Sequence, residues 1–251
     1  MGATLYLRAD DAGLSSGTNA AIDAASSVCP NIGLMAVAPA IEDAADRFRG
    51  RKELCLGFHV TLNSEWPEIP WRALAPAGSV QSLLKSPGFF YSNPWQLPPG
   101  ASYDPAEVEI ELHAQLDRLR KLGMDIRYMD SHMGVMHSTP VLEALARSFA
   151  AREGLEYPHL MPKLQHGPYT QNTPENLARW SRLLDTETGS FIAVFHPATA
   201  DGIVECLSPH EPGGVSPGMV RAAEAALLRA PEFATLLHAK DATVARFDDR
   251  A

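Results

Sequence analysis

Short apolar runs alternate along most of the chain with longer segments in which apolar residues recur every three or four positions. The short runs have the length and composition of strands, and the longer segments have the spacing of amphipathic helices. Strands are expected at residues 5–9, 31–37, 53–61, 127–130, 154–157, 191–195 and 242–247. Helices are expected at residues 19–28, 39–49, 104–122, 140–151, 174–184, 218–230 and 231–238. Such alternation of strand and helix is typical of an α/β fold with a parallel sheet.

One long segment, residues 62–102, interrupts this alternation. It is rich in proline and aromatic residues, among them Trp66, Trp71, Phe89, Phe90 and Trp95. A loop of this length inside a compact domain usually has a function of its own. Its aromatic rings suit either a platform for sugar rings or a lid with a small core. No repeat or linker divides the chain, so we expect residues 1–251 to form a single domain that carries this insertion.

The composition adds limits on size and partners. The chain has 251 residues, 45% of them hydrophobic, which suits one domain of barrel size with a buried core. A formal net charge of -9 disfavours nucleic acid and an anionic membrane as partners. The net charge does not exclude a small ligand, because the charge of a pocket can differ from that of the whole chain.

The cysteines and the amino end bear on where the protein is found. Cys29, Cys55 and Cys206 are odd in number, and no pair has the CxxC spacing. Each lies in or beside an apolar stretch, so we expect reduced thiols and a reducing compartment. No apolar run approaches the length of a membrane span, and charged residues stand where a signal peptide needs an apolar core. These features favour a cytoplasmic protein, and they leave a homodimer open.

Two adjacent carboxylates directly follow the first predicted strand. Asp10 and Asp11 repel each other unless a cation or a shared proton relieves them, which points to a metal site. An alternative is that one of them only caps the next helix. Neighbouring strand residues point to opposite faces, so the two can share a site only if the chain begins to turn there. Gly13 makes such a turn plausible.

Histidines and a further aspartate stand at the ends of other predicted strands. His59 ends the third strand, Asp130 and His132 end the next one, and His196 follows a later one. Each alone suits a hydrogen-bonded core residue, but the carboxyl ends of parallel strands converge on one face of a barrel. Two imidazoles and a carboxylate with open positions make a catalytic site for a divalent metal ion. A second carboxylate can serve as the general base.

The motifs, taken in order, resemble the YdjC-like family, also called the ChbG/HpnK-type carbohydrate deacetylases. They span nearly the whole chain, and they are Asp10-Asp11-Ala12-Gly13-Leu14-Ser15, Gly57-Phe58-His59-Val60-Thr61-Leu62-Asn63, Asp130-Ser131-His132, His196-Pro197 with Asp201, and Arg221 with Glu224. The resemblance implies a distorted (β/α) barrel with fewer than eight regular strands, akin to the NodB-type polysaccharide deacetylases. Two departures, at Ala12 and at residues 133–137, fall beside the expected pocket and concern the substrate.

The resemblance also implies a site and an activity. Asp11, His59 and His132 are expected to bind one divalent ion, zinc or magnesium, and Asp10 to act as the base. The expected reaction is hydrolysis of an N-acetyl group on a small carbohydrate, with His196 or Asp10 protonating the departing amine. Further residues are expected to support the ligands or contact the substrate, and they are Asp130, Asn63, Arg221, Glu224 and Trp66.

Several interpretations stay open at this point. Asp130 and Ser131 either hold His132 in its ligating tautomer or cap the helix that follows. Arg221 and Glu224, one helical turn apart, form either a solvated pair or part of the site. The enzyme alternatives are hydrolysis of a phosphoester or glycosidic bond and redox chemistry on ferrous iron. The alternative outside catalysis is a sugar-binding protein on the same scaffold.

Overall fold

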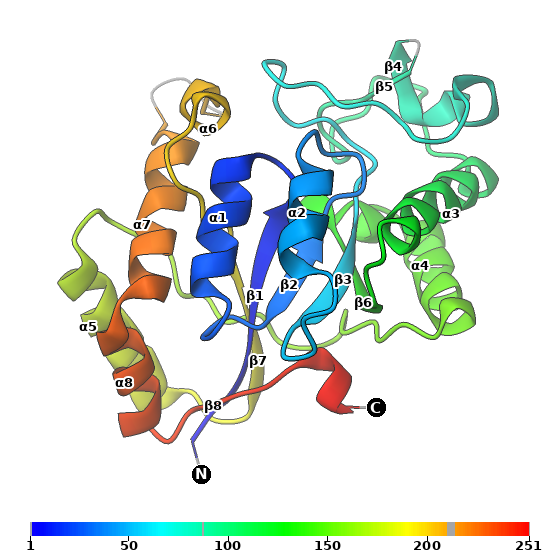
Figure 1. Ribbon diagram of the computed structural model, residues 1–251. Helices are drawn as coiled ribbons and strands as arrows, with labels where there is room; N and C mark the ends of the chain where they lie inside the picture. The colour runs from blue at the N-terminus through cyan, green and yellow to red at the C-terminus, as the bar shows by residue number, and fades with distance from the viewer. Residues whose placement is uncertain (1, 87, 210–213, 251) are drawn as a thin grey trace.

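A computed structural model describes residues 2–86, 88–209 and 214–250, and its centre is a parallel sheet (Figure 1). The strands pair in the order β6-β3-β2-β1-β7, and β8 joins the beginning of β1. All neighbouring pairs in this sheet are parallel. The strands are β1 (Thr4–Ala12), β2 (Asn31–Leu34), β3 (Cys55–Val60), β6 (Ile126–Ser131), β7 (Ser190–Phe195) and β8 (Thr243–Val244).

Helices surround the sheet, as the alternating pattern predicts. Figure 1 shows α3 and α4 beside β6, and α5, α7 and α8 on the opposite side of the molecule. The helices are α1 (Ser16–Ala25), α2 (Ile41–Phe48), α3 (Pro105–Lys121), α4 (Pro140–Glu153), α5 (Thr173–Thr186), α6 (Gly202–Cys206), α7 (Pro217–Arg229) and α8 (Pro231–Ala239). The N-cap expected at Asp104 is confirmed, because its carboxylate accepts a hydrogen bond from the Ala106 N–H. The α/β class is therefore confirmed.

The two edge strands, β6 and β7, are joined by irregular backbone rather than by a further strand. Glu156 exchanges backbone hydrogen bonds with Arg127 and Met129 of β6, and Leu164 donates one to Ile192 of β7. The strand expected at residues 154–157 is therefore reduced to a single bridge. Prolines at positions 158 and 162 lack the N–H that a continuous strand needs. The strands that the structure describes thus form a parallel sheet whose ring is not closed by strands alone.

The long insertion has more structure than the sequence indicated. It contains short 3₁₀ turns at Ala77–Ser79 and Gln81–Leu83, and an antiparallel pair of strands, β4 (Leu84–Ser86) and β5 (Phe89–Phe90). Figure 1 shows this segment beyond the carboxyl ends of the parallel strands, near the top of the view.

Three tryptophans of the insertion differ in their surroundings. The rings of Trp66 and Trp71 are buried and meet edge to face, with centroids 6.3 Å apart. These two form a small core, as one of the two interpretations predicted. Trp95 is different, because 55% of its surface is exposed.

The carboxyl-terminal third differs from the prediction in two places. The expected loop at residues 198–217 contains α6, and residues 210–213 of that loop lie outside the described part of the chain. The last strand is shorter than expected, and a 3₁₀ turn at Phe247–Arg250 follows it. The Phe247 ring packs against Tyr6 and Tyr128. The turn that carries it lies near the bottom of Figure 1, away from the insertion.

Two further expectations concern the cysteines and the membrane. Cys29 and Cys55 are buried and Cys206 is exposed, each as a free thiol. The helices within the described ranges are each too short or too polar to cross a lipid bilayer.

Candidate metal centre

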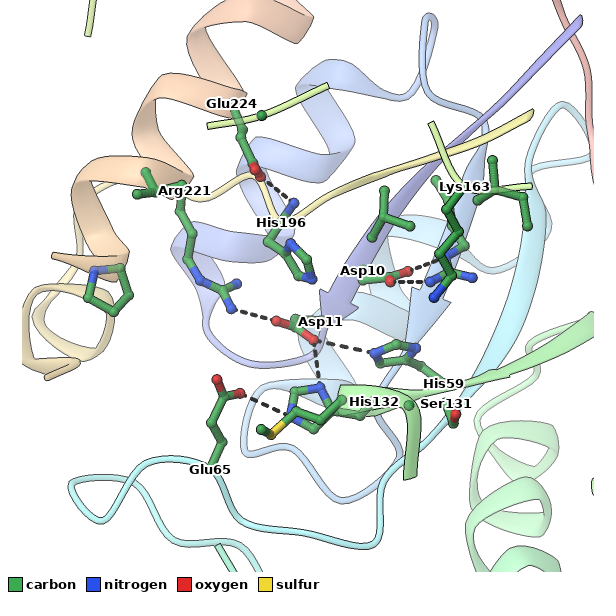
Figure 2. Close-up of a pocket in the computed structure, with 18 of the residues that line it drawn as sticks. Asp10, Asp11, His59, Glu65, Ser131, His132, Lys163, His196, Arg221 and Glu224 are labelled. Atoms are coloured by element: carbon green, nitrogen blue, oxygen red, sulfur yellow. Dashed lines mark hydrogen bonds and ion pairs between the residues drawn. The ribbon is translucent and has the colours of Figure 1, made fainter. Parts of the chain in front are cut away.

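A cavity of about 840 Å³ opens at the carboxyl ends of the strands (Figure 2). Its wall includes most of the residues that the sequence singled out, namely Asp10, Asp11, His59, His132, His196, Arg221, Glu224 and Trp66. Asp130 lines a smaller neighbouring cavity behind His59. Strands far apart in the sequence therefore bring the candidate residues into one pocket, as the strand-end argument predicted.

A local break in β1 allows both adjacent aspartates to face this pocket. Asp11 has a φ of 65°, in the left-handed region, and the pairing of β1 with β2 shifts register between Ala9 and Ala12. Such a bulge interrupts the alternation of side chains, and aspartate tolerates this conformation better than most residues. The expected turn is thus present: it begins at Asp11, and Gly13 continues it with a φ of 103°.

The neighbouring strand β2 leaves room for the first of the two carboxylates. A Cβ atom at Gly33 would lie 2.7 Å from Asp10 Oδ1, closer than real contacts allow. Glycine at this position therefore lets the Asp10 carboxylate lie against the backbone of β2.

Three donor atoms converge at the centre of the site (Figure 2). Asp11 Oδ1 lies 3.5 Å from His59 Nε2 and 3.2 Å from His132 Nδ1, and all three side chains are buried. Tetrahedral zinc with ligands at about 2.1 Å separates neighbouring donor atoms by roughly 3.4 Å. Asp11 Oδ1 is a buried carboxylate oxygen that accepts no hydrogen bond from the described residues. The set therefore fits a divalent cation in spacing and in chemistry.

Each imidazole is held from behind by a carboxylate. His59 Nδ1 lies 3.0 Å from Asp130 Oδ2, and His132 Nε2 lies 3.1 Å from Glu65 Oε2. A carboxylate on one ring nitrogen fixes the tautomer and directs the other nitrogen toward a metal ion. The sequence left two readings of Asp130 open, holding His132 or capping the next helix, and the structure instead places its carboxylate against His59.

The site carries strongly perturbed acids and bases. Burial lowers the pKa of His59, but Asp130 and Asp10 outweigh it and raise that pKa to about 10. Burial likewise lowers the pKa of His132, while Asp11 and Glu65 raise it to about 9. Burial raises the pKa of Asp11, yet Arg221 and His132 bring it well below its usual value. Without a cation, both imidazoles are therefore protonated on both nitrogens and positively charged at neutral pH.

Arg8 is a central residue that the sequence analysis did not single out. Its guanidinium donates to both oxygens of Asp10, at 2.7 and 2.6 Å, and its third nitrogen lies 2.8 Å from Asp130 Oδ2. A signal for it existed, because residues two apart on a strand share a face. Arg8 thus fixes Asp10 and links it to the carboxylate behind His59.

Helix α7 contributes a second arginine and a glutamate. Arg221 donates to Asp11 Oδ2 at 2.6 Å, and its guanidinium stands 5.1 Å from the centre of the Trp66 ring. Glu224 accepts the backbone N–H of His196, and burial raises the pKa of Glu224. Both side chains are 6% exposed, so a solvated pair is excluded. The site interpretation of these two residues fits their positions.

Three further polar residues, His196, Lys163 and His166, line the pocket. Figure 2 shows His196 pointing toward Asp11, and Lys163 lines the same pocket, where its charge acts on Asp130. Sequence reasoning gave neither Lys163 nor Glu65 a role, because neither follows a strand or belongs to a motif. His166 packs between Trp180 and Phe195, with ring centroids 5.3 and 4.6 Å away, and burial lowers its pKa to about 4.

Asn63 supports the site, whereas Asp201 lies apart from it. The Asn63 side chain donates to the Met133 sulfur at 2.9 Å, and the Asn63 backbone carbonyl accepts from the Trp71 indole at 2.6 Å. Asn63 therefore braces the turn that follows His132. Asp201 caps α6 and accepts the Gly17 N–H at 2.8 Å, so it ties the loop after β7 to α1.

Comparison with known proteins agrees with this architecture. The structure aligns over the full length of both chains, with a TM-score of 0.80 and 21% identity, to a crystal structure from Enterococcus faecalis V583. That protein is described as a proposed cellobiose-phosphate cleavage protein, and at this identity the likeness shows the fold alone. The family model "YdjC-like protein" matches residues 4–239. The chain therefore belongs to the YdjC-like family.

Proposed function

We propose that the protein is a metal-dependent hydrolase that removes an N-acetyl group from an amino sugar or a short oligosaccharide. The supporting observation is the convergence of Asp11, His59 and His132 beside a further carboxylate, Asp10, in one pocket. A nucleophile, a charge stabiliser and a base are the parts that hydrolysis of an amide needs.

A divalent ion held by Asp11, His59 and His132 would supply Lewis acidity and an activated water. The donor set of two imidazoles and one carboxylate favours zinc, and magnesium is the alternative. The chain keeps the imidazoles in place through the carboxylates of Asp130 and Glu65.

Asp10 is proposed as the general base. Its carboxylate is buried and its two oxygens accept from Arg8, so its orientation is fixed. Because Arg8 also pairs with Asp130, the guanidinium charge is shared between two carboxylates. Asp10 would take a proton from the attacking water, a contribution of about 10²- to 10⁴-fold.

His196 is proposed to protonate the departing amine. It enters the pocket from β7, whereas His59 and His132 enter from β3 and β6 (Figure 2). Its backbone N–H is held by Glu224. Asp10 would then hold the proton of the water and His196 would have lost one to the amine, so exchange with solvent returns both groups to their starting states.

The test is acetate release from a panel of N-acetylated sugars, after chelation and reloading with zinc, magnesium or manganese. We expect acetate release that disappears on chelation and returns with one of these metals. Release of phosphate or of a free sugar from other substrates would instead favour hydrolysis of a different bond. Stoichiometric sugar binding without any product would favour a binding protein.

A further inference from the structure

The insertion begins directly after β3, and its first part, residues 61–75, forms an arch beside the metal centre. The arch carries two side chains to the wall of the cavity, Glu65 and Trp66. Glu65 Oε2 lies 3.1 Å from His132 Nε2, and the Arg221 guanidinium stands over the Trp66 ring (Figure 2). The position of the arch therefore affects a partner of a candidate ligand.

The first end of the arch is held by a buried glutamine of α3. The Gln115 side chain accepts a hydrogen bond from the Thr61 backbone N–H at 3.2 Å and donates one to the Thr61 carbonyl at 2.7 Å. The Thr61 hydroxyl in turn donates to the backbone carbonyl of His59 at 2.9 Å. Gln115 thus satisfies the backbone where β3 has ended, two residues after a candidate ligand.

The second end of the arch is held by a buried glutamate one helical turn earlier. Glu111 Oε1 accepts the Leu74 N–H at 3.0 Å, and Glu111 Oε2 accepts the Ala75 N–H at 2.8 Å. The Gln115 amide also donates to Glu111 Oε1 at 2.8 Å, so the two side chains are joined. Both ends of the arch are therefore bound to one face of a single helix.

Glu111 and Gln115 are buried away from solvent and from the cavity. Both residues are 0% exposed, and neither is among the described residues that line the cavity. They interrupt the buried apolar stripe of α3, which Val108, Leu112 and Leu116 form. Buried polar side chains are costly unless they are hydrogen-bonded, and here their partners are each other and the arch. Their burial is therefore linked to holding the arch.

We propose that Glu111 and Gln115 are positioning residues that set the affinity of the metal centre through the arch. They touch neither the ligands nor the cavity, and they act by keeping Glu65 against His132. This inference rests on the metal binding in the proposed function and does not depend on the identity of the substrate.

The test compares metal binding by the wild type and by Gln115→Met, which keeps the length of the side chain and removes its hydrogen bonds. Competition with a chelating dye gives Kd for zinc. The absorption spectrum of the cobalt-loaded protein reports the geometry of the ligands. We expect Kd to rise about tenfold, the lower end of the loss for groups that orient metal ligands, and the cobalt bands to change.

Asn176→Leu is the matched control on α5. Asn176 is also 0% exposed, and its amide holds Thr170 by the same two bonds, from the backbone N–H at 3.1 Å and to the carbonyl at 2.8 Å. This variant should lose thermal stability without a change in Kd or in the cobalt spectrum. Equal rises of Kd in both variants would show a general loss of stability and overturn the proposal.

A double-mutant cycle tests the route through Glu65. If the arch acts by placing Glu65, then Gln115→Met should raise Kd much less in the Glu65→Gln background than in the wild type. Additive losses overturn the proposal. Wild-type zinc affinity in Gln115→Met overturns it as well.

Glu111→Gln is the second variant and decides the question if Gln115→Met does not fold. Its side chain keeps its size and one acceptor oxygen, so a smaller rise of Kd is expected, and an unchanged Kd overturns the proposal. A wild type that binds no metal overturns the proposed function and this inference together. If Gln115→Met weakens metal binding but no acetate is released by the wild type, the deacetylase assignment fails and the positioning role stands.

Discussion

Asp10 and Asp11 are adjacent in the chain, yet each has its own arginine. Asp10 is paired with Arg8 on the same strand, and Asp11 is paired with Arg221 on α7. Asp11 also faces both imidazoles, whereas Asp10 does not share that contact with His132. The two carboxylates are therefore suited to different tasks, one to a metal ion and one to a proton.

This division predicts the behaviour of Asp10→Asn. The amide keeps the size of the side chain but cannot accept the proton, so kcat should fall by about 10²- to 10⁴-fold. Metal content, measured by elemental analysis, should stay at the wild-type level. Asp117→Asn, at an exposed position of α3 outside the pocket, is a matched control, and its turnover should be unchanged. Full turnover in Asp10→Asn would exclude Asp10 as the base.

A second prediction at the scale of one residue concerns the effect of Glu65 on metal affinity. Glu65→Gln weakens the acceptor that holds His132 Nε2, so metal affinity should fall by about 10- to 100-fold. Competition with a chelating dye measures this loss independently of catalysis. Glu68→Gln, in the same insertion but bonded to Ser208, is the control. Equal affinity in both variants would show that Glu65 does not position the ligand.

At the scale of elements, the site depends on how closely β1 and β2 approach. Gly33 faces the Asp10 carboxylate, and a methyl group there must displace it. Gly33→Ala should therefore lower kcat at least tenfold with little loss of metal, because the added methyl group must displace Asp10 Oδ1 but meets the Cβ of the candidate ligand His59 at 3.4 Å, an ordinary contact. Acetate release and metal content are the two measurements.

Gly78→Ala is the control for that substitution. Gly78 has open space around its Cα and lies in a turn of the insertion, so activity should persist. A Gly33→Ala variant with wild-type kcat would show that the position of the Asp10 carboxylate is not critical.

At the scale of the whole molecule, the buried charges couple metal binding to pH. The pKa values of His59 and His132 lie at about 10 and 9 in the folded protein, above the usual 6.5. Raised values add stability that is fully present below pH 6.5 and is lost as pH rises through 9 to 10. The metal-free protein should therefore lose thermal stability over this range, and the metal-loaded protein should lose less.

The same coupling predicts proton release on metal binding. At pH 7 both imidazoles must lose a proton to become ligands, so affinity should rise by about 100-fold per pH unit. Calorimetry in buffers with different ionisation enthalpies counts the released protons, and we expect close to two. Binding without proton release would show that these imidazoles are not the ligands.

The sequence predicted the features of the fold that depend on a local pattern of residues. Periodicity predicted every described helix except α6 and most strands of the sheet, because each depends on the spacing of side chains along one segment. The residues that end strands were also predicted to share a site, since parallel strands end on the same side. Residues 154–157 do not form the expected strand, because the prolines that follow lack the backbone N–H that strand pairing needs.

By itself, the sequence determined an α/β chain whose acids and histidines follow strands, with motifs in the order of one family. Only the tertiary structure decided which carboxylate holds which imidazole, that Glu65 and Arg8 join the site, and that Trp66 and Trp95 line the pocket. The physical reason is distance along the chain. Pairs such as Asp11 with Arg221 are set by the order of strands in the sheet and by the packing of α7, which no local spacing encodes.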